Sequence, residues 1–206
     1  MASPLWLRLV DTYTDQPPRG AWTLLAQRAY GGDWQTITPT YLVGGAGNVA
    51  FPGFGRLSPG ASTDPYQVRV TIGAPHTITE TASGQEYLEA TVTPWTDDAP
   101  PLPNPDTVSF YPAPDYPYGA GTPLLSGSVV DGTGAPVARA AVRCVETLNG
   151  TVRTEEVRTA SNGTFRLPLR WSEGSTQVTA TGSGGTATVT IDVPADLTSA
   201  LQFTLA

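Results

Sequence analysis

The sequence has few of the side chains from which metal sites and catalytic sites are built. It contains one Cys, Cys144, and one His, His76, and none of its 11 basic residues is Lys. A zinc site needs several Cys or His ligands, and a Ser-His-Asp triad would have to use His76, which lies in a predicted loop. We therefore predict no metal site, no cofactor and no catalytic residues, so the chain is predicted not to be an enzyme.

Carboxylates are the remaining candidates for catalysis or metal binding, and their spacing in the sequence supports neither strongly. Glu155 and Glu156 lie on a predicted strand, where neighbouring side chains point to opposite faces. A glycosidase needs two carboxyl groups that face each other across a cleft, so a carboxylate-based hydrolase is the least favoured of three hypotheses. Four loop residues could gather oxygen atoms around calcium, although solvated side chains are the favoured interpretation: Asp97, Asp98, Asn104 and Asp106.

Charge and long apolar runs are also scarce. Charged residues make up 14% of the chain, and the net charge of −7 repels phosphate backbones, which predicts no nucleic-acid partner. No stretch approaches the roughly 18 apolar residues of a membrane-spanning helix. Residues 1–6 lack the basic and apolar regions of a signal peptide, which predicts synthesis in the cytoplasm. The apolar neighbours of Cys144 predict a buried thiol, and a single Cys forms no internal disulfide bond.

The sequence is rich in period-two alternation, which is typical of half-buried strands, whereas helical periodicity is almost absent. Turn sequences such as Asp131–Gly134 and Asn162-Gly163 separate the alternating runs. The predicted strands are 5–10, 22–28, 66–72 and 87–92 in the first half, and 125–130, 141–147, 153–159, 163–169, 175–181, 186–193 and 202–205 in the second.

One pattern occurs twice, at a spacing of about 120 residues. In each copy an apolar run ends in Val-Asp, at Asp11 and at Asp131, and a turn that contains Pro leads into a second alternating run. Each copy then has a short turn of Asn and Gly before a Phe, Phe51 in the first and Phe165 in the second. The spacing is too long for a solenoid repeat, so it predicts two related domains in tandem.

We predict an all-β chain of two tandem antiparallel β-sandwich domains, transthyretin-like or Ig-like, at residues 1–93 and 123–206. The Pro density of residues 94–122 excludes helix and central strand and favours an extended, aromatic arm. We expect the arm to pack against its own domain or a neighbouring subunit, and a semi-rigid spacer is the alternative. The predicted partner-binding residues are Trp95, Phe110, Tyr111, Tyr116 and Tyr118.

Three segments of the second half, Leu125–Asp131, Gly134–Val142 and Thr159–Phe165, resemble the carboxypeptidase regulatory-like family of transthyretin-like β-sandwiches. The resemblance covers residues 123–206. It is weaker in the first half, where Gln16–Arg19 replaces the compact turn and Trp34–Val43 looks inserted. The resemblance implies a fold and not a reaction, because such domains are accessory parts of enzymes, surface proteins, receptors, virus tails and contractile injection machines. The shared turn and core residues are Gly127, Asp131, Pro136, Asn162 and Phe165.

The favoured hypothesis is a non-enzymatic structural protein of a multi-subunit particle. The favoured particle is a phage virion (tail, baseplate or capsid decoration) or a related contractile injection system, with other structural proteins and further copies of the chain as partners. The alternative is a carbohydrate-binding or host-surface-binding module that uses Tyr30 and Trp34 at a hairpin tip. A cross-strand aromatic pair explains the same two residues without a ligand.

Overall fold

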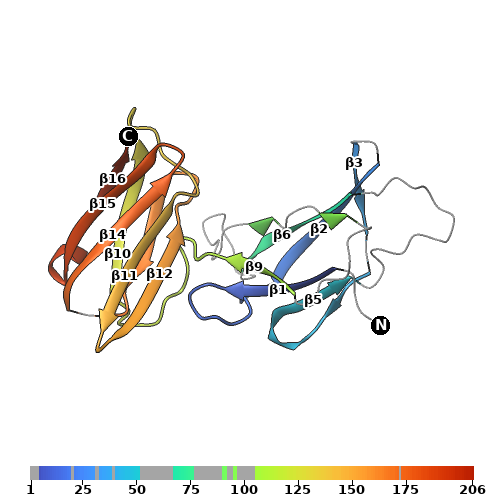
Figure 1. The fold of residues 1–206 in the computed structure, drawn as a ribbon, viewed down its shortest axis with the longest axis horizontal. Coiled ribbons are helices and arrows are strands. Elements are labelled where there is room, and N and C mark those ends of the chain that lie inside the picture. Colours follow the sequence, from blue (N-terminus) through green and yellow to red (C-terminus); the bar gives the residue numbers. More distant parts are fainter. Residues whose placement is uncertain are drawn as a thin grey trace. The chain divides into compact units, whose positions relative to one another are not determined.

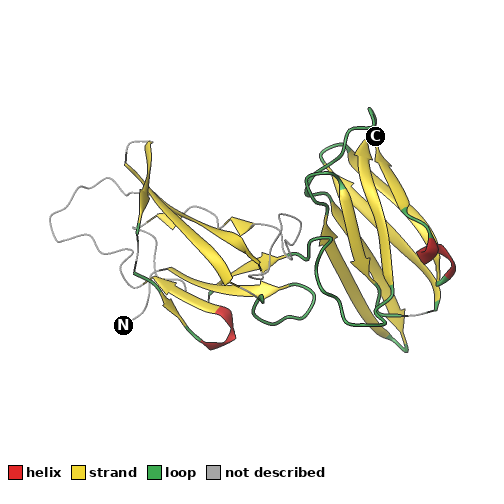
Figure 2. Cartoon of the chain, turned by 180° about the vertical axis from the view of Figure 1, so that it is seen from behind, coloured by secondary structure: helices red, strands yellow, loops and turns green. Residues whose placement is uncertain are grey.

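The structure is a computed structural model, and it describes residues 5–19, 21–30, 33–38, 40–51, 67–76, 90–91, 95–96, 105–171 and 173–206 (Figure 1). These residues form strands, turns and two short 3-10 helices, η1 (Gly45–Gly47) and η2 (Ala195–Thr198), as Figure 2 shows. The all-β class predicted from the sequence is therefore confirmed. Within the described ranges, no helix is long and apolar enough to cross a membrane.

The chain divides into two compact units. Unit 1 comprises Met1–Glu80 and Glu89–Phe110, and unit 2 comprises Thr81–Leu88 and Tyr111–Ala206. The division at Phe110 falls inside the segment 94–122 that the sequence predicted to be an arm. The predicted domain boundaries thus stay a prediction, and we describe each unit by itself.

Unit 2 has two sheets that enclose one core. One sheet has the order β13-β10-β16 and the other has the order β12-β11-β14-β15. Buried side chains from both sheets, including Leu125, Phe165, Val142 and Val178, form a single apolar cluster, so this unit is a β-sandwich. Its strands are β10 (Leu124–Asp131), β11 (Ala141–Leu148), β12 (Thr151–Arg158), β13 (Thr164–Pro168), β14 (Gly174–Gly182), β15 (Gly185–Val193) and β16 (Leu201–Leu205).

Unit 1 repeats this strand order. One of its sheets has the order β4-β5-β1-β9, and the other has the order β3-β2-β6-β7, with β8 also paired to β6. Strands β1, β5 and β9 thus correspond to β10, β13 and β16, while β4 is an extra edge strand. The strands of unit 1 are β1 (Leu5–Asp11), β2 (Ala21–Tyr30), β3 (Asp33–Ile37), β4 (Leu42–Val43), β5 (Asn48–Phe51), β6 (Gln67–His76), β7 (Ala90–Thr91), β8 (Trp95–Thr96) and β9 (Asp106–Phe110).

Three expectations from the sequence need correction. The sheets are not wholly antiparallel, because β1 pairs in parallel with β9 and β10 pairs in parallel with β16. Each of these pairs joins the first strand of a unit to its last strand, and sequence alternation carries no information on strand direction. His76, expected in a loop, is the last residue of β6. The inserted segment is shorter than 34–43, because β3 occupies the position of β12 and only β4 and its connections are additional.

The strand registers align the two copies residue by residue. Leu9 lies opposite Val108 in unit 1, as Val129 lies opposite Phe203 in unit 2. Asp11 and Asp131 occupy the same position, opposite the last residues of β9 and β16. The repeat read from the sequence is therefore a repeat of pairing geometry.

Candidate functional surfaces

The segment 111–122, part of the predicted arm, is held on unit 2 by aromatic and basic side chains. Tyr116 is 1% exposed, and its ring lies 4.7 Å from the ring of Tyr118, centroid to centroid. The Tyr118 hydroxyl donates to the carbonyl oxygen of Arg166 at 3.2 Å, and the Arg166 guanidinium lies 5.7 Å from the Tyr118 ring. Arg166 Nη1 also donates to the carbonyl oxygen of Pro114 at 2.8 Å. This part of the segment therefore contacts β13 of its own unit.

A second basic residue fixes the start of the same segment. The Arg158 guanidinium carbon lies 4.7 Å from the centre of the Tyr111 ring, in cation–π geometry. Arg158 Nη2 also donates to Glu156 Oε1 at 2.6 Å. Strands β12 and β13 thus each supply one arginine that stacks on a tyrosine of the segment.

The structure places the predicted partner-binding residues in different surroundings. Phe110 is fully buried at the end of β9 in unit 1, and Tyr116 is buried in unit 2, so neither side chain offers a surface to a partner in this arrangement. Tyr111 and Tyr118 are half-buried and stack on arginines. For three further predicted residues the strand is described but the side chain is not: Trp95 in β8, Tyr30 in β2 and Trp34 in β3. The loop residues Asp97, Asp98 and Asn104 also lie outside the described residues. Asp106, expected in the same loop group, is instead the first residue of β9, and its side chain is not described.

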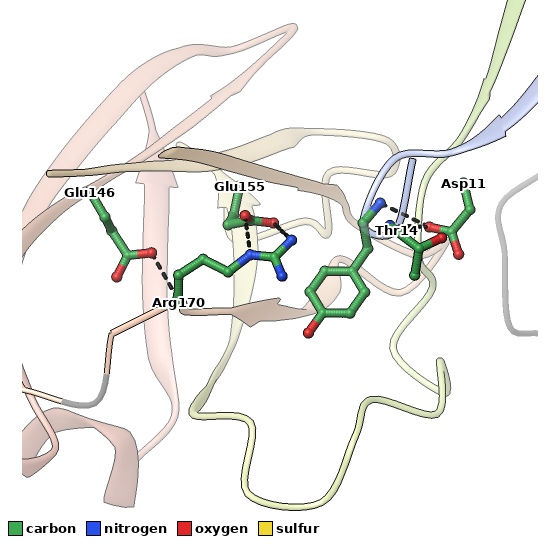
Figure 3. Close-up of polar contacts among 6 residues, drawn as sticks. Asp11, Thr14, Glu146, Glu155 and Arg170 are labelled. Atoms are coloured by element: carbon green, nitrogen blue, oxygen red, sulfur yellow. Dashed lines mark hydrogen bonds and ion pairs between the residues drawn. The ribbon is translucent and has the colours of Figure 1, made fainter. Parts of the chain in front are cut away.

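Unit 2 buries two carboxylates beside one arginine, as Figure 3 shows. Arg170 binds Glu155 through Nε and, at 3.3 Å, through Nη2, and its backbone N–H donates to Glu146 Oε2 at 2.9 Å. Glu146 is 3% exposed and Glu155 is 5% exposed. Burial raises the pKa of Glu155 above its ordinary value, and the hydrogen bond and charge of Arg170 oppose that rise. The three residues form a polar group in which both carboxylates are buried and the arginine side chain is 36% exposed.

Sequence reasoning missed Glu146. Its alternation with the buried side chains of Val142 and Cys144 places it on the inward face of β11, and this parity is the signal that marks it. The expectation for Cys144 itself is confirmed, since it is 1% exposed. Burial, reinforced by the charges of Glu146 and Glu155, raises the pKa of the Cys144 thiol to about 12. The predicted opposite faces of Glu155 and Glu156 are also seen, because Glu155 is buried and Glu156 pairs with Arg158 on the outside.

The aspartates that the two copies share hold turns. Asp11 Oδ1 accepts the backbone N–H of Tyr13 at 2.8 Å and of Thr14 at 3.3 Å (Figure 3). Asp131 Oδ1 accepts the backbone N–H and the hydroxyl of Thr133, at 2.8 and 2.6 Å, and the N–H of Ala135 at 3.0 Å. The hydroxyl of Thr133, followed by these N–H groups, lowers the pKa of Asp131. In the described part of the chain no three His, Cys, Asp or Glu residues lie close enough together to hold a metal ion.

Two surfaces of the described structure remain open. Edge strand β4 and the residue before it expose three consecutive apolar side chains: Tyr41 at 42%, Leu42 at 61% and Val43 at 60%. In unit 2, a groove of about 770 Å³ lies over β11 and β14. Its wall includes Trp171 and Glu173, from the connection between β13 and β14.

The two sheets and their common core define unit 2 as a β-sandwich. Residues 125–206 match the family model of the carboxypeptidase regulatory-like domain, so this segment is a domain of that family, as its motifs predicted. No curated protein matches the chain.

Three solved structures resemble the chain at low similarity. A streptococcal ancillary pilin has a TM-score of 0.29 and 14% identity over 98% of this chain and 62% of its own. The Bacillus anthracis TIE protein has a TM-score of 0.28 and 11% identity over 98% of this chain and 33% of its own. The major pilin subunit BcpA of Bacillus cereus, in a D312A form, has a TM-score of 0.26 and 10% identity over 89% of this chain and 55% of its own. TM-scores in this range support no inference about function.

Proposed function

We propose that this chain is a non-enzymatic structural protein of a multi-subunit assembly and that it self-associates through edge strand β4. The observation that carries the proposal is the run of exposed apolar side chains Tyr41, Leu42 and Val43 at that edge. Among the described strands β4 pairs with β5 alone, so no described strand pairs with its outer edge. An apolar, unpaired edge is a template for the strand of another chain.

The shared polar residues support a structural role. The carboxylates of Asp11 and Asp131 are engaged by turn N–H groups, and that of Glu155 is engaged by Arg170. Groups with these partners fix the shape of a loop or close a core. These engaged carboxylates are consistent with rigid domains that function by binding other proteins.

The particle that we favour is a phage virion or a related contractile injection system. The support is the carboxypeptidase regulatory-like segment, whose relatives include accessory domains of such particles, and the repeat of its strand order in unit 1. Density-gradient fractionation of producing cells, with peptide mass spectrometry, tests this setting. We expect the chain in a particle fraction at fixed stoichiometry, and recovery only among free small proteins would contradict it.

Sedimentation velocity of the full chain tests the contact itself. We expect association that increases with concentration and that Val43→Lys weakens, because a charged side chain on an edge strand opposes strand addition. The matched control is Val152→Lys, since Val152 is 61% exposed in β12 of unit 2 and Val43 is 60% exposed. A wild-type chain that stays monomeric, or equal weakening by both variants, overturns the proposal.

A further inference from the structure

The groove of unit 2 lies over strands that the assembly contact does not use. Its floor consists of β11 and β14, which are the interior strands of the sheet β12-β11-β14-β15. Arg143 and Val145 are exposed on β11 and alternate with the buried side chains of Val142 and Cys144, so the floor is the outward side of this sheet. One wall is the connection between β13 and β14, which carries Trp171.

The position of the groove excludes recognition through main-chain pairing. An extended peptide that adds to a sheet needs the free N–H and C=O groups of an edge strand. Both neighbours of β11 and both neighbours of β14 are already paired to them. A ligand in the groove therefore meets side chains, and their chemistry decides what it is.

The lining combines neutral polar groups with two apolar surfaces. Thr179, Thr181 and Gln177 can each donate and accept hydrogen bonds. Val145, which is 46% exposed, and Trp171 offer apolar area beside them. A ligand that matches this lining carries many hydroxyl groups together with apolar C–H faces that pack against an aromatic ring. Sugars have this combination.

The charges of the lining decide which kind of sugar fits. The carboxylates of Glu156 and Glu173 line the groove together with a single base, Arg143, whereas the buried side chain of Glu146 lies on the opposite face of β11. Because Glu156 is paired with Arg158, the remaining charges of the lining, Glu173 and Arg143, balance, and the groove offers no net charge that would attract a phosphate, sulfate or uronate group. A neutral sugar needs no such charge, and its hydroxyl groups can accept from Arg143 and donate to Glu173.

The residue that leads into this wall is held in place by the protein itself. Arg170, which precedes Trp171, is anchored by its guanidinium to Glu155 and by its backbone N–H to Glu146. A site that is ordered before binding loses less conformational freedom when the ligand arrives.

We propose that this groove binds a neutral oligosaccharide, with a sugar ring packed against Trp171 and with hydroxyl groups bonded by Arg143 and Gln177. This binding is a function of unit 2 alone and is independent of the β4 contact in unit 1. Loss of one leaves the other intact, so the two proposals fail separately.

Titration of the full chain by heteronuclear NMR tests the proposal, with cellotetraose, chitotetraose, maltotetraose and xylotetraose as neutral probes. We expect saturable shifts for at least one probe, and a loss of affinity of at least about tenfold in Arg143→Ala and in Trp171→Ala, which is about 1.4 kcal/mol. Gln177→Ala is the exposed variant that spares the core, and Gln202→Ala, an exposed glutamine on β16 of the other sheet, is its matched control. The slow reaction of the buried Cys144 thiol with a labelling reagent verifies that each variant is folded.

Three outcomes overturn the proposal. The first is that none of the four neutral probes binds. The second is that a probe binds equally well to wild type, Arg143→Ala and Gln177→Ala, because binding would then lie elsewhere. The third is that the resonances of the groove residues shift only with a charged probe, such as a heparin tetrasaccharide, or only with an extended peptide. Weakening by Gln177→Ala and not by Gln202→Ala supports it.

Discussion

Units 1 and 2 share one strand order but fill the same position of their cores in opposite ways. In unit 1, Leu7 of β1 lies opposite Val49 of β5, and both side chains are fully buried. In unit 2, Gly127 of β10 lies opposite Phe165 of β13. Unit 1 thus has its larger side chain on the first strand, Leu7, whereas unit 2 has it on the facing strand, Phe165. Each pair fills its core at close packing.

This exchange shows how two copies can diverge and keep their geometry. A Cβ added to Gly127 would lie 2.7 Å from Phe165 Cζ and closer still to the carbonyl oxygen of Leu201. The glycine therefore has two functions: it accommodates the Phe165 ring and it lets the parallel strand β16 approach. The register also corrects the sequence alignment, because Phe165 corresponds to Val49, and Phe51 corresponds to Leu167.

The largest expected effect comes from making unit 2 resemble unit 1 at this position. We expect Gly127→Leu to destabilise unit 2 by more than about 4 kcal/mol, because the new side chain meets both the Phe165 ring and a backbone oxygen. The double variant Gly127→Leu/Phe165→Val removes the ring but not the oxygen, so it should not restore stability. The rate at which Cys144 reacts with a thiol reagent measures opening of unit 2 selectively, since this is the one Cys of the chain. If the double variant regains the protection of Cys144 from the reagent, the Phe165 ring alone excludes the introduced leucine side chain, which would contradict this prediction.

Truncation of the two larger partners sharpens the same comparison. We expect Phe165→Ala to cost about 3–5 kcal/mol in unit 2 and Val49→Ala to cost about 2 kcal/mol in unit 1, because the deleted volume differs. Urea unfolding checks both values. Cys144 labelling follows unit 2, and intrinsic fluorescence follows unit 1, because it carries most of the tryptophans: Trp6, Trp22, Trp34 and Trp95. Equal costs would contradict the assignment of Val49 and Phe165 to one position.

The turn glycines should respond alike in both units. Gly47 (φ +76) and Gly163 (φ +78) are left-handed, and an added Cβ would lie 2.5 Å from the carbonyl oxygen of Leu9 and 2.6 Å from that of Val129. We expect Gly47→Ala and Gly163→Ala to cost about 3 kcal/mol each, since strain and a backbone clash add. Gly150 (φ +77) has open space around its Cβ position, so Gly150→Ala is the control and should cost about 1 kcal/mol. Denaturant unfolding measures the loss of stability in the three variants. If Gly150→Ala is as destabilising as Gly163→Ala, the positive φ alone explains the loss and the backbone clash contributes nothing.

The smallest expected effect is on the pH dependence of the stability of unit 2, to which Glu155 and Asp131 contribute with opposite signs. Because the folded pKa of Glu155 is raised, the folded state binds its proton more tightly, and stability falls as pH rises from the ordinary value of 4.5 through the folded pKa. Asp131 has the opposite sign: its lowered pKa adds stability that is lost as pH falls below the ordinary value of 3.8.

Urea unfolding followed by Cys144 labelling between pH 3 and pH 8 separates the two groups, with Glu155→Gln and Asp131→Asn as paired variants. Glu155→Gln should remove the fall in stability above pH 4.5, and Asp131→Asn should flatten only the acid side. A Glu155→Gln variant that keeps the wild-type slope would assign the dependence to another group.

Much of unit 2 follows from local pattern. The predicted strand 141–147 is β11 (Ala141–Leu148), and the predicted strand 186–193 is β15 (Gly185–Val193), because both alternate and an Asn-Gly or Gly-rich turn marks one end of each. The inward face of Cys144 follows from the same parity. The groove could not be predicted in this way, because its floor and wall come from strands and a connection that are distant in the sequence.

The amino-acid sequence by itself determined the all-β class, the position of the strands of unit 2 and the family of that segment, because each of these is encoded in short-range periodicity and in turn residues. Only the tertiary structure decided the parallel pairing of first and last strands, the exchange of bulk between Gly127 and Phe165, the burial of Tyr116 and the pairing of Arg170 with Glu155. These features depend on which strands become neighbours, and that choice is made by burial of side chains that are far apart along the chain.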